Sequence, residues 1–66
     1  MKIINVPENI QHARHDAGIT QCELAERMGI AHPRISEWEN GKRDPTAGSL
    51  IALAWALGIE PRELLK

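Results

Sequence analysis

Apolar residues recur along this chain at helical spacing, in short stretches that glycine and proline separate. In the first stretch, Ile10, Ala13 and Ala17 are spaced so that they share one face of a helix. Pro7 is favoured in the first turn of a helix, and Gly18 is typical of the position just after the last turn. The pattern predicts a helix between Pro7 and Gly18.

The second predicted helix begins at a capping box. Thr20 and Glu23 have the T-x-x-E spacing in which each side chain accepts a hydrogen bond from the other residue's backbone N–H. Leu24 and Met28 fall on the inward face, and Gly29 supplies the left-handed residue that ends a helix. A helix over residues 21–28 is therefore expected.

Three more short helices are predicted in the second half of the chain. The third covers about residues 32–40, and the fourth runs over residues 46–57 from a Thr46 cap. A fifth starts at Pro61 and holds Leu64 and Leu65. The chain is expected to be all-α with five helices.

Residues 21–40 form a helix, a glycine turn and a second helix. Ala25 is small where the two helices must approach, and Gly29 lies where the chain must turn sharply. A turn this tight projects the second helix as a ridge, and the major groove of DNA admits one α-helix. The apolar positions that pack this unit are Leu24, Met28, Ile30, Ile35 and Trp38.

Length and charge narrow the class of protein. Sixty-six residues allow one domain, over residues 1–66, in which residues 1–6 are a candidate N-terminal arm. The single cysteine, Cys22, excludes an internal disulfide framework, and no signal peptide or membrane-spanning run is present. We expect a soluble cytoplasmic protein. Because the net charge is −1, a nucleic acid would have to meet a local basic face.

Residues 21–29 (QCELAERMG) and 34–43 (RISEWENGKR) resemble the helix-turn-helix of the Cro/phage-repressor (XRE-like) family. The resemblance covers about residues 6–65. It implies a compact five-helix lambda-repressor-like domain, with the helix-turn-helix at about residues 21–40. The implied function is a transcription regulator, a repressor that binds a palindromic double-stranded DNA operator as a homodimer through the helix at about 32–40.

The base-reading residues are expected on the third helix, opposite Ile35 and Trp38, which should face the core. Arg34 suits guanine or a phosphate, and Glu37 can accept a hydrogen bond from cytosine N4. Glu37 as a solvated surface acid is the alternative. From this geometry and the resemblance, the candidates for base reading are His32, Pro33, Arg34, Ser36 and Glu37.

The resemblance assigns phosphate contacts to Gln21, Asn40, Lys42 and Arg43, with a merely solvated charged loop as the alternative for the last two. It also implies an internal ion pair between Arg14 and Glu39, against direct phosphate contact by these residues. One departure is Ala31, where the family usually has a Ser or Thr cap.

Dimerisation is predicted on the fourth helix. Ile51 and Trp55 lie four residues apart and off the stripe that faces the core, where relatives usually have polar residues. Two recognition helices in a two-fold dimer would reach major grooves about 34 Å apart. The residues expected at the interface are Ile51, Trp55, Ile59, Pro61 and Leu65.

Catalytic and metal sites are not expected. His12, His15 and Asp16 share a helix but do not match a zinc signature, and no nucleophile–base set or phosphate loop is present. No cofactor is expected. The alternative function is an antitoxin or other protein-interaction module of the same fold, with DNA binding secondary and a toxin or another protein as partner.

Overall fold

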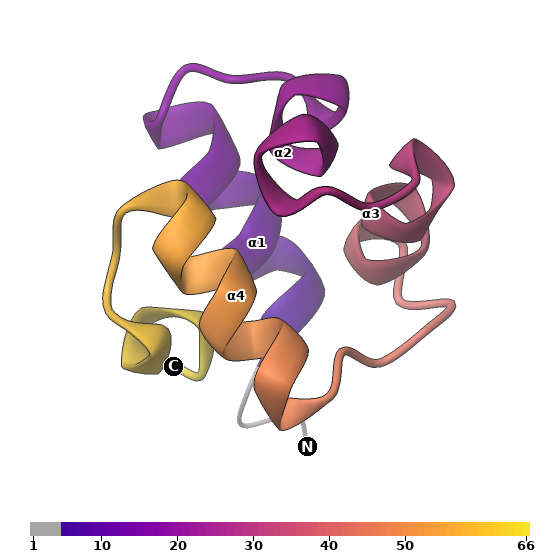
Figure 1. The fold of residues 1–66 in the computed structure, drawn as a ribbon. Coiled ribbons are helices and arrows are strands. Elements are labelled where there is room, and N and C mark those ends of the chain that lie inside the picture. Colours follow the sequence, from indigo (N-terminus) through magenta and orange to yellow (C-terminus); the bar gives the residue numbers. More distant parts are fainter. Residues whose placement is uncertain (1–4) are drawn as a thin grey trace.

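The computed structural model describes residues 5–66, and these fold into an all-α structure, as predicted (Figure 1). Residues 1–4 of the candidate arm lie outside the described residues, whereas Val6 already belongs to the first helix. The elements in chain order are α1 (Val6–Asp16), α2 (Gln21–Met28), α3 (His32–Glu39), α4 (Ala47–Leu57) and the 3₁₀ helix η1 (Pro61–Leu64).

The fifth helix differs from the prediction. It is a single 3₁₀ turn of four residues that ends at Leu64, so Leu65 lies outside it and is 43% exposed. Glu60 and Glu63 form a capping box around the turn. Four residues form a tight i→i+3 turn but are too few for a regular α-helical hydrogen-bond ladder.

Three helices end in the same sequence, glycine followed by isoleucine. After α1 the N–H of Ile19 donates to the carbonyl of Arg14 at 3.3 Å, and that of Gly18 donates to His15 at 3.0 Å. These two bonds are a Schellman motif, which turns the residue after the glycine back onto the helix. The same pair of bonds follows α2, at Gly29 and Ile30, and follows α4, at Gly58 and Ile59.

The residues that α1 and its Schellman motif bury differ from the predicted apolar stripe. Ala17 was predicted to face the core, but α1 ends at Asp16 and Ala17 is exposed. Ile19 is buried in its place. Helical spacing does not continue past the cap, so the buried position follows the turn and not the stripe.

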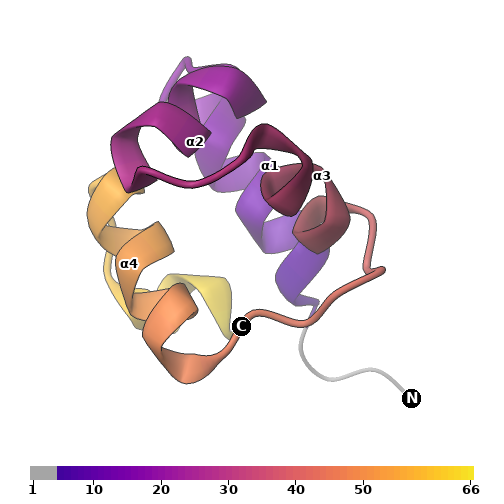
Figure 2. The same cartoon turned by 45° about the vertical axis from the view of Figure 1, so that its right-hand side comes forward.

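Each element contributes at least one fully buried aliphatic side chain to a single core. The helices surround this core with α3 at one side of the molecule (Figure 2). Trp38 is also buried, as the sequence predicted. The largest fully buried side chains are Ile10, Leu24, Ile35, Leu53 and Leu64.

Two glycine-to-alanine changes should alter stability in opposite directions. Gly29 has φ +67°, a conformation that costs an L-residue about 1–2 kcal/mol, so Gly29→Ala should destabilise the protein by about that amount. Gly48 is helical, and a methyl group there meets nothing nearer than the Thr46 hydroxyl at 4.0 Å. Gly48→Ala should therefore stabilise by about 0.4–1 kcal/mol. Urea unfolding of both variants checks the signs, and equal signs would contradict the account.

Candidate nucleic-acid interface

The helix-turn-helix is formed by α2, a three-residue turn and α3. Thr20 Oγ1 accepts from the Glu23 N–H at 3.1 Å, and Glu23 Oε1 accepts from the Thr20 N–H at 2.9 Å. The hydrogen bond from the Thr20 backbone, and then that with its side chain, lowers the pKa of Glu23 below its ordinary value. This predicted capping box fixes where α2 begins. Ala25 is buried at the point where the helices meet.

The outer side of α3 is open to solvent. His32, Pro33 and Arg34 are exposed in its first turn, and Ser36 and Glu37 are partly exposed. Ala31 makes no side-chain cap, and Pro33 stands in the first turn, where its missing N–H costs nothing. The five residues predicted to read bases thus lie on one helix, with Ile35 and Trp38 buried on its other side.

Behind α3, Arg14 and Glu39 form an ion pair in which the Glu39 side chain is buried and the Arg14 side chain is partly buried. The Arg14 guanidinium donates from Nε to Glu39 Oε2 at 2.8 Å and from Nη2 to Oε1 at 3.1 Å. Arg14 Nη1 also donates to the Ile19 carbonyl at 3.0 Å, and the Gln11 amide donates to the Glu39 carbonyl at 2.9 Å. Glu39 is 4% exposed. This pair joins α1 to the end of α3.

Gln21 is not free at the surface, because both ends of its amide are occupied. Its Nε2 donates to Glu39 Oε1 at 3.0 Å, and its Oε1 lies 3.1 Å from His32 Nε2. Gln21 was predicted only as a phosphate contact. One amide hydrogen is still available for that contact, since the NH₂ group has two.

Two predicted DNA-binding residues are paired with each other. Arg43 Nε donates to Glu37 Oε1 at 3.0 Å, so a candidate base reader and a candidate phosphate contact meet across the loop after α3. Asn40 Nδ2 also donates to Ser36 Oγ, at 3.3 Å. The sequence did not indicate the Arg43–Glu37 contact, because it depends on how the loop folds back.

That loop begins with a fourth Schellman pair, but with lysine in the place of isoleucine. The N–H of Lys42 donates to the Glu37 carbonyl at 2.9 Å, and that of Gly41 donates to Trp38 at 3.3 Å. Ile19 after α1 is buried, and Ile30 and Ile59 pack against the core, whereas Lys42 is exposed. The chain thus puts a cation beside α3 at a position that elsewhere contributes to the core.

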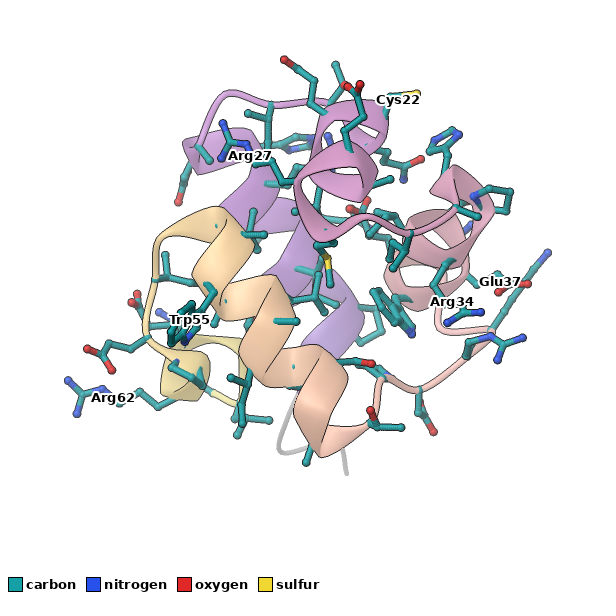
Figure 3. All side chains as sticks on the ribbon, in the orientation of Figure 1. Cys22, Arg27, Arg34, Glu37, Trp55 and Arg62 are labelled. Carbon is teal, nitrogen blue, oxygen red and sulfur yellow. The ribbon has the colours of Figure 1, made fainter. Side chains whose placement is uncertain are left out.

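A second exposed surface lies on α4, away from Arg34 and Glu37 (Figure 3). Trp55 is 81% exposed and Ile51 50%. Of the other predicted interface residues, Leu65 is exposed, whereas Ile59 and Pro61 are half-buried. A groove of about 560 Å³ between α2 and α4 is lined by Arg27, Met28, Gly48, Ile51, Ala52, Trp55 and Ala56.

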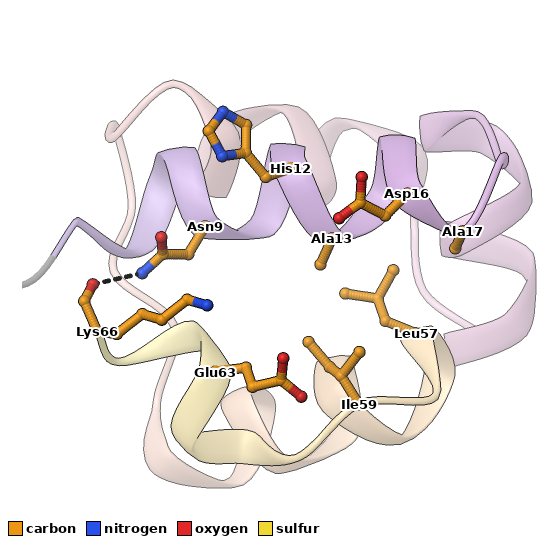
Figure 4. Close-up of a pocket in the computed structure, with 9 residues that line it drawn as sticks. All are labelled: Asn9, His12, Ala13, Asp16, Ala17, Leu57, Ile59, Glu63 and Lys66. Atoms are coloured by element: carbon orange, nitrogen blue, oxygen red, sulfur yellow. Dashed lines mark hydrogen bonds between the residues drawn. The ribbon is translucent and has the colours of Figure 1, made fainter.

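A smaller cleft of about 300 Å³ separates α1 from the C-terminal part of the chain (Figure 4). Asp16 and Glu63 line it together with His12 and Lys66, and Asn9 Nδ2 donates to the Lys66 carbonyl at 2.8 Å. Among residues 5–66, no group of three or more histidine, cysteine or acidic residues is placed to hold a metal ion. None of the described helices is long and apolar enough to cross a membrane.

Comparison with known proteins places this fold in a family. The family model described as helix-turn-helix matches residues 10–64. The chain is 34% identical over 64 residues to the HTH-type transcriptional regulator DicA of Escherichia coli K12, covering 97% of this chain but 47% of DicA, so it spans about half of that relative. It is 38% identical over 60 residues to y4dJ, an uncharacterised HTH-type transcriptional regulator of Sinorhizobium fredii, covering 91% of this chain and 78% of y4dJ.

A solved structure of a phage repressor has the same fold. The P22 c2 repressor, determined in complex with a synthetic operator, superimposes with a TM-score of 0.82 at 34% identity over 92% of each chain. The resemblance inferred from residues 21–43 is confirmed at the level of the family. The chain belongs to the helix-turn-helix family of the Cro/phage-repressor type.

Proposed function

We propose that this chain is a sequence-specific double-stranded DNA-binding transcription regulator, a repressor that occupies a palindromic operator as a homodimer. The observation that carries the proposal is the exposed ridge of α3, fixed from behind by the buried Arg14–Glu39 pair. The likeness to the operator-bound P22 c2 repressor supports it. No catalytic activity and no cofactor are part of the proposal. Selection of bound duplexes from a random pool at low ionic strength is the direct test, and enrichment of no sequence would overturn it.

The α3 residues divide by the chemistry they offer to base edges. Arg34 has the donors for guanine O6 and N7, and Glu37 can accept from cytosine N4. Pro33 offers apolar contact only, and His32 and Ser36 complete the base-reading set. The Arg43 guanidinium offsets the charge of Glu37, which eases the approach of this acid to a phosphate-lined groove.

The proposed phosphate contacts are made by polar and positively charged side chains on both sides of α3. Lys42 and Arg43 supply positive charge on one side, with the Asn40 amide beside them, and Gln21 offers its second amide hydrogen on the other. Lys42 and Arg43, together with Arg34, are the positive charges that a chain of net charge −1 offers to DNA on this side.

The homodimer is proposed to form through α4. A tryptophan with 81% of its surface exposed, beside half-exposed Ile51 and an apolar groove, is typical of an interface. Leu65 extends this surface, and the half-buried Ile59 and Pro61 are assigned to its edge. Trp55 lies on the other side of the molecule from Arg34 and Glu37, so dimerisation would leave α3 free (Figure 3).

The same exposed tryptophan favours a second candidate function, an antitoxin or other protein-interaction module. In that case the α4 surface holds a different protein, such as a toxin, and DNA binding is secondary. Sedimentation of the purified chain separates the two candidates: self-association supports the homodimer, and a monomer that assembles only with a foreign chain supports the second candidate.

Lys42→Ala should weaken binding to all DNA sequences alike. Removing one phosphate contact should reduce the slope of log affinity against log salt by about one unit, because one fewer counterion is released. Anisotropy titrations between about 50 and 200 mM salt measure the slope. Arg62→Ala is the matched control, since it removes the same charge on the Trp55 side (Figure 3). Equal slopes for Lys42→Ala and wild type would remove Lys42 from the interface.

Glu37→Ala should relax base preference at one position in each half-site, because the acceptor for cytosine N4 is lost. It also releases Arg43, so affinity for nonspecific DNA should rise. Sequencing of selected duplexes and titration against a random duplex measure the two effects. An unaltered sequence preference would show that Glu37 is only a solvated acid.

Trp55→Ala should raise the dimer dissociation constant by about tenfold or more, as expected for a central aromatic residue. Sedimentation equilibrium measures the constant. Arg34→Ala, on the opposite surface, serves as the control and should leave it unchanged. A dissociation constant unaffected by Trp55→Ala would contradict the proposed interface.

A further inference from the structure

A continuous chain of hydrogen bonds connects the core to the first residue of α3. Arg14 donates to Glu39 at 2.8 Å, Gln21 donates to Glu39 at 3.0 Å, and His32 Nε2 lies 3.1 Å from Gln21 Oε1. Glu39 is buried, Gln21 is half-buried and His32 is exposed. These hydrogen bonds therefore fix the position of the His32 ring relative to the buried Glu39 carboxylate. His32 lies on the surface that the proposed function assigns to DNA.

The chemistry of each group fixes the direction of each bond. The Glu39 carboxylate, paired with the Arg14 guanidinium, can only accept, so Gln21 must turn its NH₂ group toward it. This orientation leaves the Gln21 carbonyl oxygen facing His32. A carbonyl oxygen also only accepts, so His32 must donate to it from Nε2–H. In a neutral imidazole the other nitrogen, Nδ1, is then an acceptor.

We propose that His32 reads a base through Nδ1 as a hydrogen-bond acceptor, and so selects adenine or cytosine at its position. These bases present an amino group in the major groove, N6 of adenine or N4 of cytosine, whereas guanine and thymine offer no hydrogen-bond donor there. The proposal rests on the proposed DNA-binding function. Gln21 and Glu39 act through His32 and are positioning residues.

This role of Gln21 is separable from a phosphate contact. A phosphate contact by its second amide hydrogen affects all sequences equally, whereas the position of the His32 ring affects only one base pair in each half-site. Substituting Gln21 should therefore lower the affinity for all sequences and also weaken the preference at one base pair. Only the loss of base preference should depend on His32.

The first measurement uses the free protein at pH 8, where an ordinary imidazole is neutral. Long-range ¹H–¹⁵N spectra should show His32 protonated at Nε2 and unprotonated at Nδ1. In Gln21→Leu the two ring ¹⁵N shifts of His32 should move toward each other as the tautomer is released, while His12 stays unchanged. Cys22→Ala, at the neighbouring exposed residue of α2, is the control and should leave His32 as in wild type. An Nδ1-protonated His32, or a ring spectrum indifferent to Gln21→Leu, would overturn the proposal.

The second measurement is selection of random duplexes at pH 8 with wild type, Gln21→Leu, His32→Ala and the double variant. Wild type should prefer adenine or cytosine at one position per half-site by about fivefold, the size expected of one net hydrogen bond. Both single variants should flatten that position. The double variant should match His32→Ala there and lose only additional sequence-independent affinity.

The outcomes distinguish this inference from the function it rests on. Enrichment of no sequence by wild type would overturn both. Enrichment of an operator with guanine or thymine at the position that His32→Ala flattens would overturn the His32 assignment alone. If Gln21→Leu keeps the wild-type preference for adenine or cytosine at that position, the His32 assignment is also overturned. His32 is exposed, so His32→Ala should leave the fold intact, which circular dichroism checks.

Discussion

The ion pair between Arg14 and Glu39 is the constraint on which the rest of this molecule depends. A carboxylate that is 4% exposed is tolerable only if its charge and its lone pairs are satisfied. Arg14 supplies two hydrogen bonds and Gln21 a third. Because these donors come from α1 and α2 and the acceptor from α3, satisfying one buried charge sets the mutual position of three helices. Removing Arg14 would leave the Glu39 charge buried without its cation.

This constraint gives a short helix a rigid base. An eight-residue helix is marginal by itself in water, and α3 also has no side-chain cap at Ala31. Its position comes from Ile35 and Trp38 in the core and from the pair at Glu39. The outer residues of α3 are thus presented by packing on the opposite side of the helix, and they do not have to stabilise the fold themselves.

The molecule separates two kinds of surface. The side of α3 carries charge, with Arg43 offsetting Glu37 and Lys42 exposed where three other helix ends continue with isoleucine. The outer face of α4 carries apolar area, with Trp55 and Ile51 beside a groove. Because the core draws on every element, neither surface needs residues from the other.

Sequence alone determined the four α-helices and their capped ends, because these depend on interactions within one turn: the Thr20 capping box, the glycines that follow α1, α2 and α4, and the spacing that buries Trp38. It also determined the family, from the residues of the helix-turn-helix and the loop after it. Tertiary structure decided the features that depend on residues more than one helical turn apart. Ile19 is buried because the glycine cap turns the chain back onto the core, whereas Ala17 is exposed, and the last helix is a 3₁₀ turn. The contacts of Gln21 with Glu39 and His32, and of Glu37 with Arg43, join residues six or more positions apart. Local periodicity has no access to such contacts, since they exist only once the chain has folded back on itself.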